Sequence, residues 1–448
     1  MARSLLNQMS KKFIILITIL ILIIVLFFGF SYLTKDNTNT NQNTENSNKN
    51  FFSDIFNFGN ITQNETVNNI VDFVTGNNEE KEGDIEEVKK LYKISSMPIT
   101  GYGILEKEVY IEVPDLLPEE VDFNEGNQNQ TEAPKTEFIS VIRYADKRNG
   151  NIYENQINKT EERKYSNTEI FKVHESLFTN RNTIMRYLKN NDTIVTFLGE
   201  ISKDVIGGDS ENAHEIFGSF LPDGIKDISV SKEKNEFFYL TNSRDGVIGN
   251  LINEKGEKIQ VFNSSFSEWN SHFPNKDYVI LNTRPSGLVD GFSYILNLKN
   301  KDFNKILGNI KGLTTLSNNT LSTILYSDNN LSIKLFDLSR EETRNLRLRT
   351  HPEKCVWSND NVILYCAIPK EIEADLIYPD AWYQGEVSYN DEIWKIDTYT
   401  GAKTKLIDPN TLYENENIDA INLSLDKDEK TLFFMNKVDS YLWALRLD

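Results

Sequence analysis

Short runs of apolar and aromatic residues, separated by polar turn residues, recur through most of the chain after residue 88. The pattern is clearest in four runs that follow one another, 355–358, 362–368, 392–397 and 403–407. Runs of this length that are rich in β-branched and aromatic side chains are typical of β-strands. Four antiparallel strands in sequence order form one blade of a β-propeller, so this stretch predicts such a blade.

Two weaker signs of the same blade recur along the chain. The first is a polar turn followed by a strand rich in Phe, Tyr, Ile and Leu, as at 231–240 and 427–434. The second is an aromatic and aliphatic strand that ends in a turn, as at 333–337 and 441–445. The pattern predicts an all-β propeller of about seven blades, with six to eight compatible with it. These blades are expected to begin near residues 97, 169, 224, 264, 310, 353 and 418.

The two ends of the predicted propeller complement each other. The last blade ends at Asp448 after its third strand, whereas residues 89–95 form a spare strand before the first blade. Pairing the two would close the ring and remove both open sheet edges. We therefore expect Leu91 to Ser95 to supply the outer strand of the blade formed by residues 418–448.

The repeat itself resembles a known family. A Ser-x-Asp-x-Lys type of turn before a Phe-rich strand resembles the repeat of TolB-like, WD-type propellers and of the propeller domain of prolyl-oligopeptidase-type peptidases. The closing segment, residues 422–447, also resembles membrane-anchored propellers of small-genome bacteria. The resemblance covers about residues 89–448. It implies a fold but no ligand, because the repeat encodes a turn and a strand.

Residues 13–33 contain no charged side chain, and as a helix they would span about 31 Å, close to the thickness of a bilayer core. A cleaved signal peptide has a shorter apolar region and a small-residue cleavage site, so we expect an uncleaved, single-pass transmembrane helix. Arg3, Lys11 and Lys12 precede this helix without any acidic residue. The positive-inside rule then places the N-terminus in the cytoplasm and the rest of the chain outside it, at the cell membrane.

The chain directly after this apolar span is predicted to be a flexible tether. Up to about residue 50 it consists almost entirely of Asn, Thr, Gln, Ser and charged residues, which cannot bury enough apolar surface to fold. Apolar residues return within 51–74, and two interpretations stay open there: a short amphipathic helix or an unstructured linker. The predicted organisation is a cytoplasmic N-terminus (1–12), a transmembrane helix (13–33), a flexible acidic linker (34–88) and a propeller (89–448).

Composition narrows the functional classes. The 448 residues carry 48 basic and 67 acidic side chains, which gives a net charge of −19 and a pI near 4.8. A nucleic-acid-binding protein normally has a basic face, so no nucleic-acid partner is expected. The four histidines, His174, His214, His272 and His351, are scattered without metal-ligand spacing. We therefore expect neither a metal nor another cofactor.

The only two cysteines of the chain, Cys355 and Cys366, lie equally far from the centre of a short predicted hairpin around Asp360 and Asn361. Residues placed in this way face each other directly across antiparallel strands, at a distance close to that of a disulfide. An extracytoplasmic propeller would lie in an oxidising compartment, so we predict a disulfide. The alternative is a pair of buried thiols in neighbouring strands.

Motifs of propeller enzymes are missing from the sequence. It contains no Gly-x-Ser-x-Gly nucleophile elbow, no Gly-rich phosphate loop and no calcium loop. Residues 243–246, Ser-Arg-Asp-Gly, resemble part of a sialidase turn but lack its Trp, so an ordinary hairpin turn is the simpler interpretation. No catalytic residue can be named, and the balance leans away from an enzyme.

An insertion at 369–390 separates the second and third strands of the sixth predicted blade. It combines aromatic and acidic residues, which suits recognition of sugars, cationic groups or a protein partner. The candidate binding residues are Tyr378, Asp380, Trp382 and Tyr383. In the alternative interpretation, Trp382 and Tyr378 pack the insertion onto the neighbouring blade.

Three functions therefore remain open. The leading hypothesis is a membrane-anchored, extracytoplasmic propeller that acts as a binding or scaffold module of the cell envelope, with a protein or glycan partner. The second is a cell-envelope enzyme that acts on glycan or peptide through an acidic central channel, which would need converging carboxylates. The third is a subunit of an envelope complex. An aromatic patch on one rim would favour binding, and carboxylates converging in the channel would favour catalysis.

Overall fold

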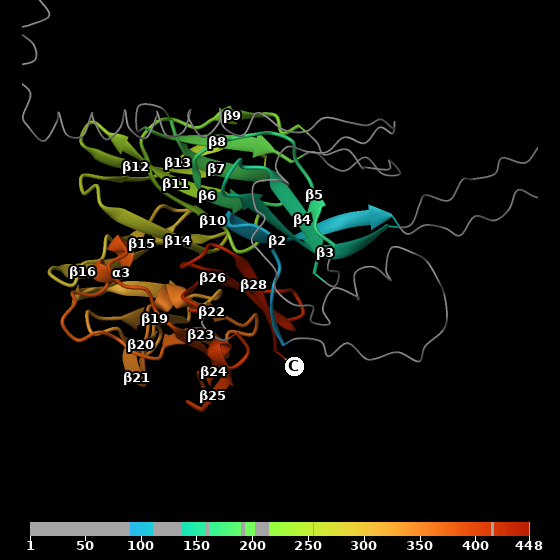
Figure 1. The fold of residues 1–448 in the computed structure, drawn as a ribbon. Coiled ribbons are helices and arrows are strands. Elements are labelled where there is room, and N and C mark those ends of the chain that lie inside the picture. Colours follow the sequence, from blue (N-terminus) through green and yellow to red (C-terminus); the bar gives the residue numbers. More distant parts are fainter. Residues whose placement is uncertain are drawn as a thin grey trace, which may run out of the picture. The chain divides into compact units, whose positions relative to one another are not determined.

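The computed structural model describes residues 90–110, 136–157, 161–189, 193–201, 215–253, 255–413 and 416–447. These residues form seven four-stranded antiparallel sheets, which are the blades of a β-propeller (Figure 1). The all-β class and the seven blades agree with the sequence prediction. Six of the sheets consist of four strands consecutive in sequence, and the seventh combines strands from both ends of the described chain.

The first four blades occupy residues 99–311. Blade 1 consists of β2 (Ile99–Tyr110), β3 (Thr136–Asp146), β4 (Ile152–Gln156) and β5 (Arg163–Lys164). Blade 2 consists of β6 (Val173–Phe178), β7 (Asn182–Leu188), β8 (Ile194–Glu200) and β9 (Gly218–Phe220). Blade 3 consists of β10 (Ile225–Val230), β11 (Phe237–Ser243), β12 (Gly246–Ile252) and β13 (Lys258–Ser264). Blade 4 consists of β14 (Trp269–Asn275), β15 (Tyr278–Thr283), β16 (Asp290–Asn297) and β17 (Phe303–Lys311).

The last three blades complete the ring. Blade 5 consists of β18 (Thr314–Ser317), β19 (Thr323–Ser327), β20 (Ser332–Asp337) and β21 (Glu342–Arg349). Blade 6 consists of β22 (Cys355–Trp357), β23 (Ile363–Pro369), β24 (Asp391–Asp397) and β25 (Lys403–Ile407). Blade 7 consists of β26 (Ala420–Leu425), β27 (Thr431–Asn436), β28 (Leu442–Arg446) and β1 (Leu91–Lys93). Short helices are η2 (Pro352–Lys354), α3 (Asp380–Gln384) and η3 (Pro409–Thr411).

Local turn chemistry explains why the blade starts were readable in the sequence. In the turn after β22, Ser358 Oγ accepts the Ile363 N–H at 2.8 Å and Asp360 accepts the Val362 N–H at 2.9 Å. Asn361 takes a φ of 63°, a left-handed conformation that Asn tolerates better than most residues. The seven innermost strands begin at residues 99, 173, 225, 269, 314, 355 and 420, each within a few residues of its predicted start.

Strand β1 closes the ring as predicted. It pairs antiparallel with β28, with Leu91 opposite Leu445 and Lys93 opposite Trp443. Backbone hydrogen bonds extend the pairing beyond the strand, since the Ile94 N–H donates to the Leu442 carbonyl at 2.8 Å. In Figure 1 the blue strand β2 lies beside the red strands β26 and β28, so blades 1 and 7 are neighbours, and apolar residues of both share one core cluster.

The hydrophobic core lies between neighbouring sheets. Every residue of β27 is buried, whereas most residues of the outer strand β25 are exposed. One cluster joins Ala367 and Ile393 of blade 6 to Phe434 and Trp443 of blade 7, together with Leu91 of the closing strand. Burial therefore falls from the inner strands to the outer ones. Each blade is stabilised mainly by the faces of its two neighbours.

Several predictions fall outside the described residues. These are the cytoplasmic N-terminus at 1–12, the transmembrane helix at 13–33 and the linker at 34–88. Within the part of the chain that the structure describes, no helix is both long and apolar enough to cross a membrane. The turn at 243–246 is described, and it is an ordinary two-residue hairpin turn that joins β11 to β12, with Ser243 opposite Gly246.

Candidate functional site

The insertion between β23 and β24 folds back on the propeller. It contains the cis peptide bond Tyr378–Pro379 and the single helical turn α3. This turn ends at Gly385, whose φ of 77° lies in the left-handed region that glycine adopts without steric cost. At the other end of α3, Asp380 accepts a hydrogen bond from the Gly287 N–H at 2.7 Å. This bond holds the insertion against the loop between β15 and β16 of blade 4.

The four candidate binding residues of this insertion differ in how far they are exposed to solvent. Trp382 and Tyr378 are only 4% and 3% exposed, Asp380 is half-buried and Tyr383 is 41% exposed. In the binding interpretation Trp382 would be exposed beside Tyr378 or Tyr383, whereas its side chain is buried, so the packing alternative describes Trp382 and Tyr378. The physical reason is a complete set of partners, because the Trp382 indole stacks on His351 with ring centroids 4.4 Å apart. No exposed aromatic patch forms from these four residues.

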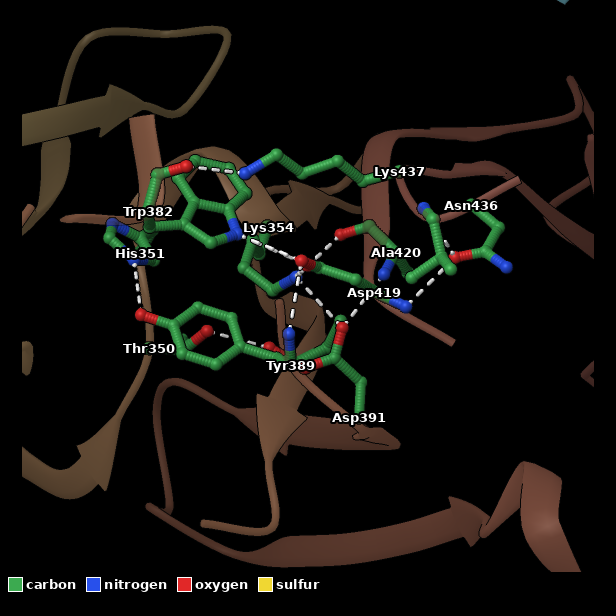
Figure 2. Close-up of polar contacts among 12 residues, drawn as sticks. Thr350, His351, Lys354, Trp382, Tyr389, Asp391, Asp419, Ala420, Asn436 and Lys437 are labelled. Atoms are coloured by element: carbon green, nitrogen blue, oxygen red, sulfur yellow. Dashed lines mark hydrogen bonds and ion pairs between the residues drawn. The ribbon is translucent and has the colours of Figure 1, made fainter. Parts of the chain in front are cut away.

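A buried ion cluster lies beneath the insertion. The Lys354 ammonium donates to Asp391 Oδ2 at 2.8 Å, to the Ala420 carbonyl at 2.9 Å and to Asp419. The side chains of Lys354, Asp391 and Asp419 have no exposed surface at all. They come from η2, from the first residue of β24 and from the residue before β26. Figure 2 shows the three groups converging between blades 6 and 7.

Aromatic rings enclose the same ammonium. Its nitrogen lies 5.3 Å from the ring centroids of both Trp382 and Tyr389. The Trp382 Nε1–H donates to Asp419 at 3.0 Å, and the Tyr389 N–H donates to the same carboxylate at 3.1 Å. On the outer side, Lys437 lies 4.2 Å from the Trp382 ring (Figure 2). These contacts attach the insertion to blade 7 through both polar and cation–π interactions.

Burial determines the protonation of this cluster. It raises the pKa of Asp391 to about 6, and the Lys354 ammonium only partly offsets that rise. The remaining oxygen of this carboxyl, Oδ1, is buried without a hydrogen-bond partner among the described residues. Burial, with Lys354 nearby, also holds the pKa of His351 well below its usual value, so the ring is neutral at pH 7. Its Nε2 lies 3.0 Å from the Tyr389 hydroxyl.

The ion cluster is suited to holding the structure together and unsuited to catalysis. Its charged atoms are saturated by protein groups, apart from Asp391 Oδ1, and none of the three charged side chains reaches solvent. A substrate would have to displace the insertion to touch them. We therefore interpret Lys354, Asp391 and Asp419 as an ionic clamp that joins blade 6, blade 7 and the insertion.

The central channel offers a space that a ligand can reach. A cavity of about 470 Å³ lies where the inner strands turn into the second strands of their blades. Every blade contributes to its wall, with Ile104, Asn180, Lys232, His272, Ser317, Trp357 and Leu425 as one residue from each. A concave site with convergent polar groups is the usual form of a small-molecule site. We call this space the channel mouth.

The channel mouth is not acidic. Its charged lining consists of three lysines and three carboxylates, Lys232, Lys234, Lys427, Glu106, Glu233 and Asp426. Two of the carboxylates are occupied, since Glu106 pairs with Lys427 at 3.2 Å and Asp426 accepts the Thr431 N–H at 2.9 Å. At the channel mouth the carboxylates are therefore matched by an equal number of lysines, so this cavity does not supply the acidic lining that the enzyme hypothesis required. The cause is the turn after β10, which places two lysines at the rim.

Lys232 and Lys234 stand apart from the other charged groups of the channel mouth. Within the described residues neither ammonium forms an ion pair; Lys232 and Glu233 are exposed at the rim, and Lys234 is half-buried. Burial, with the charge of Lys232 nearby, lowers the pKa of Lys234 to about 8. The pKa of Lys232 is also lowered, by burial, and Glu429 and Glu233 partly offset that effect. The two lysines thus lack the anionic partner that would restore their usual pKa.

Two buried polar atoms of the channel mouth are also without partners. His272 Nε2 and Ser317 Oγ make no hydrogen bond among the described residues, and Ser317 is only 3% exposed. Burial, followed by the charge of Lys232, lowers the pKa of His272 to about 4, so this ring is neutral at pH 7. Unpartnered buried polar atoms are uncommon in folded proteins. Both atoms belong to side chains that line the cavity.

Contacts between neighbouring turns fix the rim of the channel mouth. The Asn180 N–H donates to the Lys234 carbonyl at 2.7 Å, which joins blades 2 and 3. The Asn319 N–H donates to Asn361 Oδ1 at 2.8 Å, which joins blades 5 and 6. The Asn359 side chain donates to the Lys427 carbonyl at 3.3 Å, which joins blades 6 and 7. These bonds hold the two unpaired lysines on a preformed rim.

The two cysteines form a disulfide beside the channel mouth, whose wall includes Cys355. Cys355 in β22 lies directly opposite Cys366 in β23, and both are buried. Their sulfur atoms are bonded, with an S–S distance of 2.09 Å and a Cα–Cα distance of 4.1 Å. Within the described residues no group of His, Cys, Asp or Glu has the arrangement of a metal site.

Sequence reasoning missed both polar constellations. The clamp unites Lys354, Asp391 and Asp419, which are far apart in sequence and are each surrounded by ordinary strand patterns. The channel mouth contains Lys232 and Lys234, which sequence analysis noticed only as part of a repeat turn. The available signal was positional. Lys232 and Lys234 lie in the turn between the innermost and the second strand of blade 3, at the end of the blade where the cavity opens.

No protein-family model matches the chain, and no curated protein matches it. Among solved structures, TolB from Acinetobacter baumannii matches with 9% identity and a TM-score of 0.37. That match covers 56% of this chain and 58% of the TolB chain.

Two oligogalacturonate lyases also match. One was solved in complex with manganese and has 12% identity over 69% of this chain and 85% of its own, with a TM-score of 0.42. The lyase from Vibrio parahaemolyticus has 9% identity over 69% of this chain and 86% of its own, with a TM-score of 0.43. The propeller assignment therefore rests on the strand pairing of this chain itself.

Proposed function

We propose that the chain is a membrane-anchored, extracytoplasmic propeller that works as a binding module of the cell envelope, with the channel mouth as its ligand site. The observation that carries the proposal is the cavity to which every blade contributes, whose wall holds two lysines and two buried polar atoms without a partner in the part of the chain that the structure describes. Unpaired polar groups in a preformed concave site are those a ligand can satisfy.

Two features of the sequence support the location. The uncharged span at 13–33, preceded by Arg3, Lys11 and Lys12, suits an anchor whose C-terminal side lies outside the cytoplasm. The disulfide pairing of Cys355 with Cys366 suits an oxidising compartment. The TolB-like, WD-type character of the repeat and the role of the membrane anchor belong to this proposal.

The enzyme alternative has less support. It required carboxylates that converge in the channel, and Glu106 and Asp426 of the channel mouth are already held by Lys427 and by a backbone N–H. The scaffold alternative needs a surface for a protein partner. The insertion does not provide the expected aromatic patch, because Trp382 and Tyr378 are buried. A ligand-binding module is the function that the described geometry supports best.

Two measurements test the proposal. Protease added to intact cells should remove the propeller, and protection of the whole chain would contradict the topology. Separately, the full-length chain in detergent is incubated with the small-molecule fraction of its own envelope, and retained compounds are quantified by mass spectrometry. The K232Q/K234Q double variant should lose a compound that the wild type retains. The matched control K299Q/K301Q changes two exposed lysines in the turn between β16 and β17. Equal retention by both variants would exclude the channel mouth as the site.

A further inference from the structure

The channel mouth also indicates what kind of ligand it takes, an inference that rests on the proposed function. Its wall carries two kinds of polar group that have no partner within the described residues. On the blade 3 side are the ammonium groups of Lys232 and Lys234, which form no ion pair within the described residues. On the wall of blades 4 and 5 are His272 Nε2 and Ser317 Oγ, which make no hydrogen bond there.

The charges on the wall favour an anionic ligand. Burial and, to a smaller extent, the charge of Lys232 lower the pKa of Lys234, so the two ammonium groups repel each other at this rim. Of the acids near them, Glu106 and Asp426 are engaged elsewhere and Glu429 accepts from the Asn359 N–H, while Glu233 and Glu429 offset only part of the effect of burial on Lys232. An anionic group placed between the ammonium groups would form charge-assisted hydrogen bonds, which are the stronger class of polar contact. A cationic ligand would meet repulsion at the same place.

The neutral groups of the wall restrict the chemical class of the ligand further. His272 is uncharged at pH 7, and a backbone hydrogen bond with Ser317 leaves Nε2 as its free ring nitrogen. The Ser317 hydroxyl can donate and accept. A ligand hydroxyl satisfies both kinds of atom, because it donates to a ring nitrogen and exchanges hydrogen bonds with a serine. Lys232 lowers the pKa of His272, which indicates that its charge acts on the same space.

We infer that the channel mouth binds a small organic anion that also carries hydroxyl groups, with Lys232 and Lys234 on the anionic group and His272 and Ser317 on a hydroxyl. The cavity volume of about 470 Å³ is within the usual range for a site of small-molecule size. The rim is preformed through the Asn180–Lys234 bond, so binding needs little reordering of the protein.

The test uses three probes of nearly equal size and different charge with the full-length chain in detergent. These are gluconate, which has one carboxylate and several hydroxyls, its neutral counterpart sorbitol, and cationic glucosamine. Acetate serves as an anion without hydroxyls. Binding is measured by calorimetry. Gluconate should bind more tightly than the other three probes, and preference for sorbitol or glucosamine would overturn the inference.

Variants then locate the binding. K232Q/K234Q should weaken gluconate binding by about tenfold or more, the expected loss when charge-assisted hydrogen bonds are removed. The control K299Q/K301Q, on the outside of blade 4, should leave it unchanged. S317A should weaken gluconate but not acetate, a difference that a general loss of folding would not produce. Gluconate binding that is unaffected by K232Q/K234Q would overturn the inference.

The two proposals can fail separately. If the envelope compound retained through Lys232 and Lys234 is neutral or cationic and gluconate does not bind, the ligand class is wrong and the binding function stands. If K232Q/K234Q retains the same compounds as the wild type and no anion binds, both proposals are wrong. If the retained compound carries an acidic group and hydroxyls, both are supported.

Discussion

The Lys354 ammonium lies 2.8 Å from Asp391 Oδ2, and neither side chain has any surface exposed to solvent. A buried ion pair of this kind contributes little net stability compared with apolar residues, but removing one member leaves an uncompensated charge in a desolvated site. Here the ammonium serves two carboxylates, since Asp419 accepts from it as well. Of the three clamp residues, Lys354 is therefore the one whose replacement should lower the stability most.

Replacing this cation should destabilise the propeller strongly. We expect Lys354→Met to lower the free energy of unfolding by about 3–5 kcal/mol, because two buried carboxylates lose their counter-charge. The matched control is Lys405→Met in the same blade, where the lysine is half-exposed and pairs with Glu392 at 3.0 Å. A partly exposed pair contributes about 1 kcal/mol or less. Denaturant unfolding of both variants measures the difference, and equal losses would show that the clamp does not stabilise the fold.

Stability should also depend on pH through Asp391. Its pKa in the folded state is about 6, above the ordinary value of 3.8, so the folded protein holds this proton more tightly than the unfolded chain does. The contribution of this group to stability is therefore largest below about pH 4 and falls as the pH rises towards 6. A shift of about two pKa units corresponds to about 3 kcal/mol.

Asp391→Asn isolates this effect, because an amide cannot ionise. In the wild type the Ala420 N–H donates to Asp391 Oδ2 at 2.8 Å, and the amide oxygen can still accept this bond. The stability of the wild type relative to Asp391→Asn should fall between pH 4 and pH 6, by at most about 3 kcal/mol. Chemical denaturation at several pH values measures the two curves. Parallel curves across this range would mean that Asp391 titrates normally.

The part of the fold that sequence predicts is the part set by local rules. Turn residues such as Ser358 and Asn361 fix the hairpins within a few positions, and alternating apolar runs fix the strands between them. The closing strand was also predictable, because a missing strand at one end and a spare strand at the other have one simple solution. Seven similar local signals therefore gave the blade number.

The candidate sites depend on distant partners and were less predictable. Trp382 looked like a recognition residue because it stands among acids in a long loop, and its burial follows from His351 and Asp419, which the sequence pattern does not connect to it. Similarly, Lys234 becomes notable only when blades 2 and 4 place Asn180 and His272 around the same cavity. Periodicity describes neighbours along the chain, whereas these sites are built across blades.

Ring closure can be tested in the full-length chain at one residue. Leu91 in β1 is fully buried in the cluster between blades 6 and 7. We expect Leu91→Ala to lower the free energy of unfolding by about 2–5 kcal/mol, as for other buried leucines. Leu288, which is 64% exposed in the loop after β15, provides the control, and Leu288→Ala should change stability by no more than about 0.5 kcal/mol.

A truncation tests the same closure more directly. A chain that begins at Pro98 lacks β1 and exposes the edge of β28, so it should unfold at a lower temperature than a chain that begins at Lys89. The comparison is a pair of thermal melts. An unchanged melting temperature would mean that the ring is stable without its closing strand, and the pairing of Leu91 with Leu445 would then be dispensable.

The disulfide between Cys355 and Cys366 gives the last prediction. The two residues are 11 positions apart, so the loop that the bond closes is short and its chain-entropy contribution is near or below about 3 kcal/mol. Protein purified from its own cells without reductant should show no free thiol when unfolded, and two after reduction. Reduction should lower the melting temperature modestly, and Cys355→Ala/Cys366→Ala should melt close to the reduced protein. Two free thiols in the unreduced material would contradict the disulfide. They would also weaken the extracytoplasmic placement, because an oxidising compartment should have closed a pair that lies face to face.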